Sequence, residues 1–140
     1  MKIFWRIILA LGIIIALVVA YFLVFVYFKP HVDYLKAEVD IEIAGEQLYR
    51  EFVDDPLQAA KTYNGKVLLV EGVVENIEYL DDMTIAVMIY DDGFFGKEGI
   101  RFTLLEGQEK YLLTGRLNRL KGYCTGFTGA DVILEHASVH

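Results

Sequence analysis

Three pairs of adjacent aspartates are the features of this sequence that come nearest to metal chemistry: Asp54-Asp55, Asp81-Asp82 and Asp91-Asp92. A calcium loop needs oxygen ligands at alternating positions, and none of the three segments has that spacing. Turn formation and helix capping account for all three pairs. The sequence therefore predicts no metal site and no cofactor.

Histidine and cysteine offer little more. His136 and His140 are four residues apart on a predicted strand, a separation of about 13 Å that is too long for one metal ion. Cys124 is the only cysteine, so it cannot form an internal disulfide, and we expect it to pack as a small buried side chain. The sequence contains neither a nucleophilic triad pattern nor a glycine-rich phosphate loop. We therefore expect a protein that is not an enzyme.

Two adjacent aromatic residues, Phe94-Phe95, lie between Gly93 and Gly96 in a loop predicted over residues 91–96. Neighbouring side chains of an extended chain point in opposite directions. One ring can plug the end of the domain while the other stays exposed, and an exposed apolar side chain usually marks a contact. The loop is therefore a candidate contact site, with plugging as the structural alternative.

The strands on either side of this loop alternate in polarity. Their apolar residues are predicted to face the core: Ile85, Val87, Ile89, Ile100, Phe102 and Leu104. The remaining residues then share the outer face, where a Tyr and an Arg could stack on or pair with a ligand. An ordinary solvated face is the structural alternative. The predicted ligand or partner residues are Met88, Tyr90, Phe94, Phe95, Arg101 and Thr103.

The elements that position these residues are mostly strands, predicted over residues 66–77, 85–90, 100–104, 117–124 and 132–139. A helix is predicted over residues 45–53, and a second begins at Pro56 behind an Asp55 cap and stops at Asn64-Gly65. Residues 39–43 read as a strand or extended arm, and Gly72 as a bulge or bend. Five strands, with a crossing element over residues 106–113, favour a Greek-key barrel of the OB type.

Residues 7–28 contain no charged residue, and as a helix they would reach about 33 Å, enough to span a bilayer core of about 30 Å. Trp5 and Tyr27 lie near the two boundaries, as interfacial aromatic residues do. A cleaved secretion signal is the alternative, but after Ala20 only bulky residues follow, which leaves no small-residue cleavage site. We predict an uncleaved transmembrane helix ahead of the mainly β domain.

The chain is thus divided into a tail with one transmembrane helix (1–28), a linker and extended arm stiffened by Pro30 (29–43), and a helix with the barrel (44–140). Lys2 and Arg6 precede the span, and so short a tail usually stays inside. This places the barrel outside the inner (cytoplasmic) membrane, in a periplasm-like space.

The domain after the span is acidic. Residues 33–140 hold 10 Lys and Arg against 20 Asp and Glu, so their net charge is 10 − 20 = −10. A phosphate backbone is captured by clustered Lys and Arg, so nucleic acid is an unlikely partner on charge grounds. Anionic headgroups should repel the domain as well, which leaves the apolar span to hold it at the membrane.

Several segments carry a family resemblance: the helix Glu46-Gln47-Leu48-Tyr49-Arg50-Glu51-Phe52, the block Tyr63-Asn64-Gly65-Lys66-Val67, and the block Lys121-Gly122-Tyr123-Cys124-Thr125-Gly126. Over about residues 37–139 the chain resembles the tRNA-anticodon-like OB-fold family (tRNA_anti-like) of bacterial envelope proteins. The resemblance implies an OB barrel behind a lipoprotein signal or anchor, and it implies no catalytic residues. A second cysteine that the family often carries near the last strand is absent here, where the sequence reads Glu135-His136-Ala137-Ser138.

Three functions follow as hypotheses. The first is a membrane-anchored, non-catalytic binding module that presents strands two and three and the aromatic loop to a protein, peptide or glycan. The second is a small structural subunit of a membrane complex, whose span would pack through Gly12, Ala16 and Ala20. Nucleic-acid binding is the third, and the acidity disfavours it. The sequence leaves the oligomeric state open.

Overall fold

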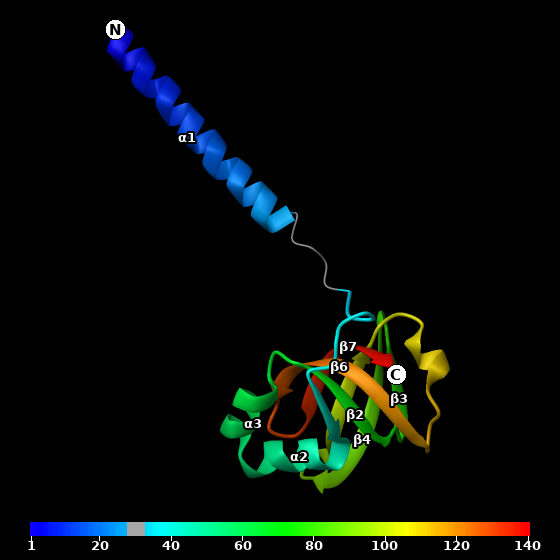
Figure 1. The fold of residues 1–140 in the computed structure, drawn as a ribbon. Helices are drawn as coiled ribbons and strands as arrows, with labels where there is room; N and C mark the ends of the chain where they lie inside the picture. The colour runs from blue at the N-terminus through cyan, green and yellow to red at the C-terminus, as the bar shows by residue number, and fades with distance from the viewer. Residues whose placement is uncertain (28–32) are drawn as a thin grey trace. The chain divides into compact units, whose positions relative to one another are not determined.

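The computed structural model describes residues 1–27 and 33–140. Its contacts divide the chain into two units, Met1–Val32 and Asp33–His140 (Figure 1). Each unit is considered by itself. The predicted end of the span at Phe28 and the predicted linker residues Lys29, Pro30 and His31 lie outside the described residues.

The first unit contains helix α1, Lys2–Tyr27. Among the residues that the structure describes, it is the one helix long and apolar enough to cross a membrane, and none of its side chains is buried. Its 26 residues correspond to about 39 Å, more than a bilayer core of about 30 Å. The helix begins before the predicted Ile7, because the polar flank that contains Lys2 and Arg6 continues the same helix. α1 is compatible with membrane anchoring.

The first regular element of the second unit is strand β1, Ile41–Ala44, followed by helices α2, Gly45–Asp54, and α3, Pro56–Tyr63. The predicted cap is present: the Asp55 carboxylate accepts a hydrogen bond of 3.1 Å from the backbone N–H of Gln58. Gly65, with φ of 78°, allows the chain to leave α3 in the left-handed region, as its position after the helix predicts.

Six more strands form the barrel with β1. They are β2, Val67–Val73; β3, Asn76–Leu80; β4, Met83–Gly93; β5, Gly96–Leu104; β6, Leu117–Phe127; and β7, Val132–Val139. A short 3-10 helix, η1, Gln108–Tyr111, lies between β5 and β6, where the crossing element was expected. The strand order is β1-β2-β6-β7-β5-β4-β3, with β1–β2 and β5–β7 parallel and the other pairs antiparallel.

The barrel closes through the junction of β2 and β3. These two strands follow each other in the chain but lie far apart in the strand order. The N–H of Glu75 donates to the carbonyl of Val87 at 3.0 Å, and the N–H of Gly115 donates to the carbonyl of Val74 at 2.8 Å. The predicted OB-type barrel is therefore confirmed, with the long first strand divided into β2 and β3 and with β1 added beside β2.

β2 has no bulge at Gly72, because β2 and β6 pair in unbroken register through Gly72 and Asn118. The glycine is needed for space instead. A Cβ at this position would lie 2.5 Å from the Tyr90 hydroxyl and 2.7 Å from the Met88 sulfur.

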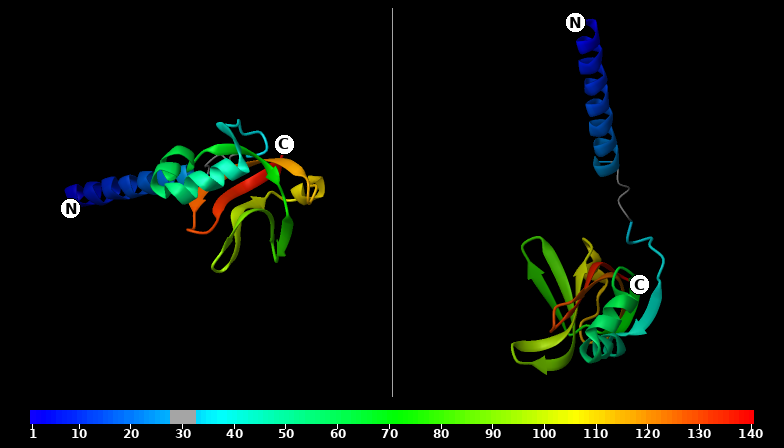
Figure 2. Two further views of the ribbon diagram at one scale, coloured as in Figure 1. Left: turned by 90° about the horizontal axis from the view of Figure 1, so that it is seen from below. Right: turned by 90° about the vertical axis from the view of Figure 1, so that its left-hand side faces the viewer.

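The core lies inside the barrel and continues beneath α2 and α3. Leu48 and Phe52 of α2 and Tyr63 of α3 belong to the same buried cluster as the strand residues. Cys124 is fully buried in this cluster, as the sequence predicts. The helices therefore pack against the barrel, and the tips of the hairpins β3–β4 and β4–β5 point away from them (Figure 2).

Candidate binding surface

Strand β4 turns a different face to the core from the one expected. Met88 lies directly opposite Ile100 of β5, and Ala86 lies opposite Phe102. All four side chains have an exposed fraction of 0%. The prediction that Met88 lies on the outer face is wrong, because the residues of β4 that face the core are shifted by one position from those expected. Both faces of β4 are apolar, so alternation alone could not tell which one is buried.

Tyr90 follows Met88 on the inner side and is half-buried beneath α2, so its predicted place on the outer face is also wrong. Its ring stacks on Tyr49 of α2 with centroids 5.8 Å apart. Its hydroxyl lies so close to Gly45 that a Cβ there would be 2.1 Å away. Burial, followed by Glu46 and Glu75, raises the pKa of Tyr90 to about 12. Tyr90 therefore joins α2 to the barrel.

The outer face of β4 and β5 carries Arg101 and Thr103, which alternate with the buried Phe102 and Leu104. Arg101 lies opposite Val87, and its guanidinium pairs with the carboxylate of Glu78 on β3. Arg101 and Thr103 thus lie on the outer face beside apolar residues of β4, and Arg101 forms an ion pair with Glu78 there. Their role as ligand contacts stays a prediction.

The aromatic pair forms the tip of a hairpin. β4 and β5 extend further than predicted, until Gly93 pairs with Gly96, and only Phe94 and Phe95 connect them. The exposed fractions are 94% for Phe94 and 95% for Phe95. The rings contact each other edge to face, with centroids 4.9 Å apart. Neither ring enters the core, so barrel plugging is wrong.

Helix α2 braces the stem of this hairpin. Arg50 pairs with Asp91 at 3.3 Å and donates to the backbone carbonyl of Tyr90 at 3.2 Å. The Tyr49 hydroxyl donates to the Glu98 carboxylate at 3.3 Å. Sequence reasoning missed these residues, because the partners lie about forty residues or more apart in the chain and belong to no motif.

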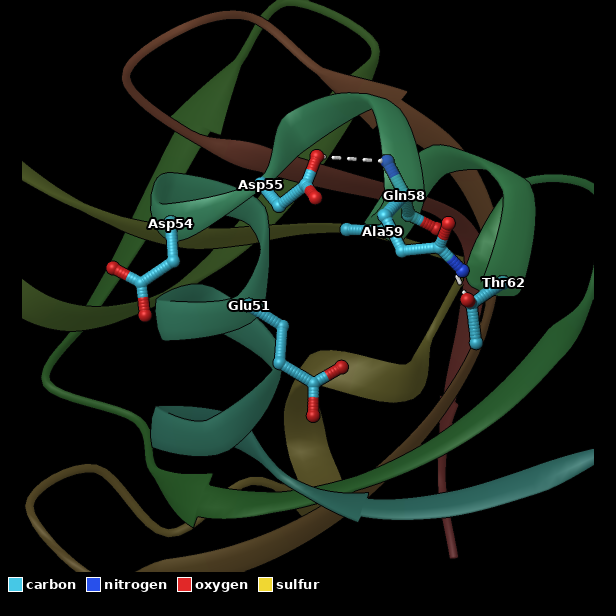
Figure 3. Close-up of a pocket in the computed structure, with 6 residues that line it drawn as sticks. All are labelled: Glu51, Asp54, Asp55, Gln58, Ala59 and Thr62. Atoms are coloured by element: carbon cyan, nitrogen blue, oxygen red, sulfur yellow. Dashed lines mark hydrogen bonds between the residues drawn. The ribbon is translucent and has the colours of Figure 1, made fainter.

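A shallow cavity of about 250 Å³ lies where α2 meets α3 (Figure 3). Its lining comprises Glu51, Asp54, Asp55, Gln58, Ala59 and Thr62. In Figure 3 the Asp55 carboxylate turns toward the backbone N–H of Gln58 as the helix cap. The hydroxyl of Tyr63, which is not drawn there, donates to the Glu51 carboxylate. Within residues 1–27 and 33–140, no group of three His, Cys, Asp or Glu side chains could hold a metal ion.

In α1 the three small residues Gly12, Ala16 and Ala20 lie on an exposed helix. A Cβ at Gly12 would meet no atom within 4 Å. The structure thus leaves room for another helix there, and the packing role of these residues stays a prediction.

The comparisons with known proteins concern the fold. The model of the tRNA_anti-like family matches residues 1–139. Among solved structures, the chain is similar to a lipoprotein of Klebsiella pneumoniae to which nucleic-acid binding is ascribed. The sequence identity is 17% and the TM-score is 0.54, and the match covers 80% of this chain and 99% of that chain. No curated protein matches the chain. At 17% identity the structural likeness establishes the fold and no ligand.

Proposed function

Because the chain belongs to the tRNA_anti-like family and its OB-type barrel follows an apolar helix, we propose that it is a membrane-anchored, non-catalytic binding module that contacts a protein through the Phe94-Phe95 hairpin. In this proposal α1 lies in the inner membrane and the barrel outside it. The flank that contains Lys2 and Arg6 supports that orientation.

The near-complete exposure of both phenylalanines carries the proposal. Folding gains nothing from leaving two such rings in water, since burial of one phenylalanine side chain is worth about 1.5–3 kcal/mol. A two-residue hairpin turn is ordinarily built from Gly, Asn or Asp. Bulky apolar residues at this position, on a stem braced by Arg50, are better explained by contact with another molecule.

Charge favours a protein over nucleic acid. Three arginines of the barrel unit are already paired with carboxylates: Arg50 with Asp91, Arg101 with Glu78, and Arg119 with Glu42 at 2.9 Å and Glu71 at 3.7 Å. The net charge of residues 33–140 is 10 − 20 = −10. A phosphate backbone would have to break these pairs against the net charge of the domain.

Two buried titratable groups, Cys124 and Tyr63, are poor candidates for catalysis. Burial raises the pKa of the Cys124 thiol to about 11 and that of Tyr63 to about 12. Nucleophilic and general-base groups need a pKa shifted toward neutrality. Both groups are held in their neutral, unreactive form.

Co-purification of the full chain in mild detergent tests the proposal. The parent should retain a protein partner, and the double substitution Phe94→Ser with Phe95→Ser should lose it while folding normally. Tyr79→Ser, which removes an exposed aromatic ring from the other hairpin, is the matched control and should retain the partner. Equal recovery of the partner with the parent, the double variant and Tyr79→Ser would contradict the proposal. So would tight binding of a single-stranded oligonucleotide by the parent at about 50 mM salt.

A further inference from the structure

The segment Asp33–Asp40, here called the strap, is the first part of the barrel unit after α1. It contains no regular secondary structure apart from a turn, in which the N–H of Lys36 donates to the carbonyl of Asp33 at 3.1 Å. It is nevertheless attached to the barrel in three places, each through different chemistry.

Lys121 of β6 makes the first attachment. Its exposed fraction is 6%, and its ammonium donates to the backbone carbonyls of Leu35 and Ala37, both at 2.8 Å. A buried ammonium is costly unless its hydrogens are satisfied. The strap supplies two of the acceptors that this lysine needs.

Tyr34 makes the second attachment. Its ring stacks on the imidazole of His136 with centroids 4.1 Å apart and planes 4° from parallel, and it meets the ring of Tyr123 edge-on at 5.9 Å. His136 has φ of 53° and lies where the β6–β7 register shifts. A bulge of this kind redirects a side chain, and here it presents the imidazole to Tyr34.

Asp40 makes the third attachment, beside the start of β2. Its backbone N–H donates to the carbonyl of Val67 at 2.8 Å, and its carboxylate accepts from the N–H of Val67 at 2.9 Å. This paired contact continues directly into β1, so the end of the strap is part of the sheet.

Between these attachments the strap buries little. Leu35 is exposed, and so is the side chain of Lys36. Segments with few buried apolar contacts open at low free-energy cost while the rest of the fold stays intact. The contacts at Tyr34, Leu35 and Ala37 can therefore separate from the barrel without unfolding it.

We propose that the strap is a releasable coupling between the anchor helix and the barrel. Docked, it joins the chain to the β6–β7 surface; released as far as the sheet contact of Asp40, it adds the seven residues 33–39 ahead of the sheet, which can span about 24 Å when extended. The coupling sets how far the barrel can move from its anchor. It does not depend on what the Phe94-Phe95 hairpin binds.

Trypsin digestion of the full chain in phosphatidylcholine vesicles tests the coupling, because Lys36 is a tryptic site inside the strap. Lys29 is followed by Pro30, and trypsin cleaves poorly before proline, so cleavage at Lys36 is the event that releases Ala37–His140 into solution. The parent should be cleaved slowly, at the rate at which the strap opens.

Lys121→Met removes both hydrogen bonds and should accelerate the release about tenfold or more, since hydrogen bonds to a charged group are individually worth about that factor. Tyr34→Ser should accelerate it as well, and it keeps the test decisive if Lys121→Met fails to fold. Lys61→Met, on the exposed side of α3, is the control and should leave the rate unchanged. Parent-like rates in both strap variants would overturn the proposal. So would a parent that is cut at Lys36 only when the barrel unfolds.

Discussion

Arg50 of α2 and Asp91 of β4 form an ion pair that joins the helix to the stem of the aromatic hairpin, with 3.3 Å between Nη1 and Oδ2. The same guanidinium donates through Nη2 to the carbonyl of Tyr90, at the point where the β4–β5 register shifts between Ile89 and Asp91. Arg50 thus contacts the hairpin at the position where the hydrogen-bonded pairing of β4 and β5 is irregular.

Arg50→Ala should loosen the hairpin without unfolding the barrel. The ion pair is half exposed, so its loss should cost at most about 1 kcal/mol in the free energy of unfolding. Hydrogen exchange at the amides of residues 92–98 should nevertheless become faster, because the stem loses its brace. Arg116→Ala, at another exposed arginine, is the control. Unchanged exchange in Arg50→Ala would show that the stem is rigid without the pair.

Gly45→Ala should destabilise the barrel unit. The new methyl would lie 2.1 Å from the Tyr90 hydroxyl, and such overpacking typically costs about 1–3 kcal/mol. Adding Tyr90→Phe removes the nearest clashing atom and should restore part of the loss. Urea denaturation of the parent, both single variants and the double variant gives the coupling energy. Additive effects would contradict the close approach.

The sequence predicts the architecture better than it predicts the surface. The Asp55 cap, the Asn64-Gly65 stop and the run of apolar strands are local signals, and each one corresponds to an element in the structure. The sequence does not determine which face of β4 is buried in the core, because Met88 and Val87 are equally plausible core residues when each is considered alone. Only the pairing of Met88 with Ile100 decides between them.

The strap and the hairpin brace could not be read from the sequence for a related reason. Lys121 and Leu35 are 86 residues apart, and the contact is made by a backbone carbonyl, which every residue possesses. The exposure of Phe94 depends on how far β4 and β5 remain paired, which local composition does not determine.

Stability should fall at high pH because of Tyr63. Burial and the hydrogen bond to Glu51 raise its pKa to about 12 in the folded state, against 10.0 for the ordinary phenol. The unfolded chain therefore loses this proton first, and the stabilisation present below pH 10 is lost as the pH rises toward 12. Thermal melts between pH 8 and about 11.5 should show the decline, and Tyr63→Phe should lessen it. An equally steep decline in Tyr63→Phe would assign the effect to other groups.

Cys124 should be protected from alkylation in the folded protein. Its thiol is buried and its pKa is raised to about 11, so the thiolate fraction at pH 8 falls about a hundredfold below that of an ordinary cysteine. Iodoacetamide should label the native chain far more slowly than the urea-unfolded chain, as measured by mass spectrometry. Equal labelling rates would place the thiol at the surface.

Photo-cross-linking at the hairpin tip tests the proposed function most directly. A benzoylphenylalanine placed at Phe95 in the full chain, in intact cells, should give a discrete adduct with a protein. The adduct should disappear with Phe94→Ser and should be absent when the probe replaces Tyr79. Adducts confined to lipid or nucleic acid, or the absence of any adduct that depends on Phe94, would contradict the account.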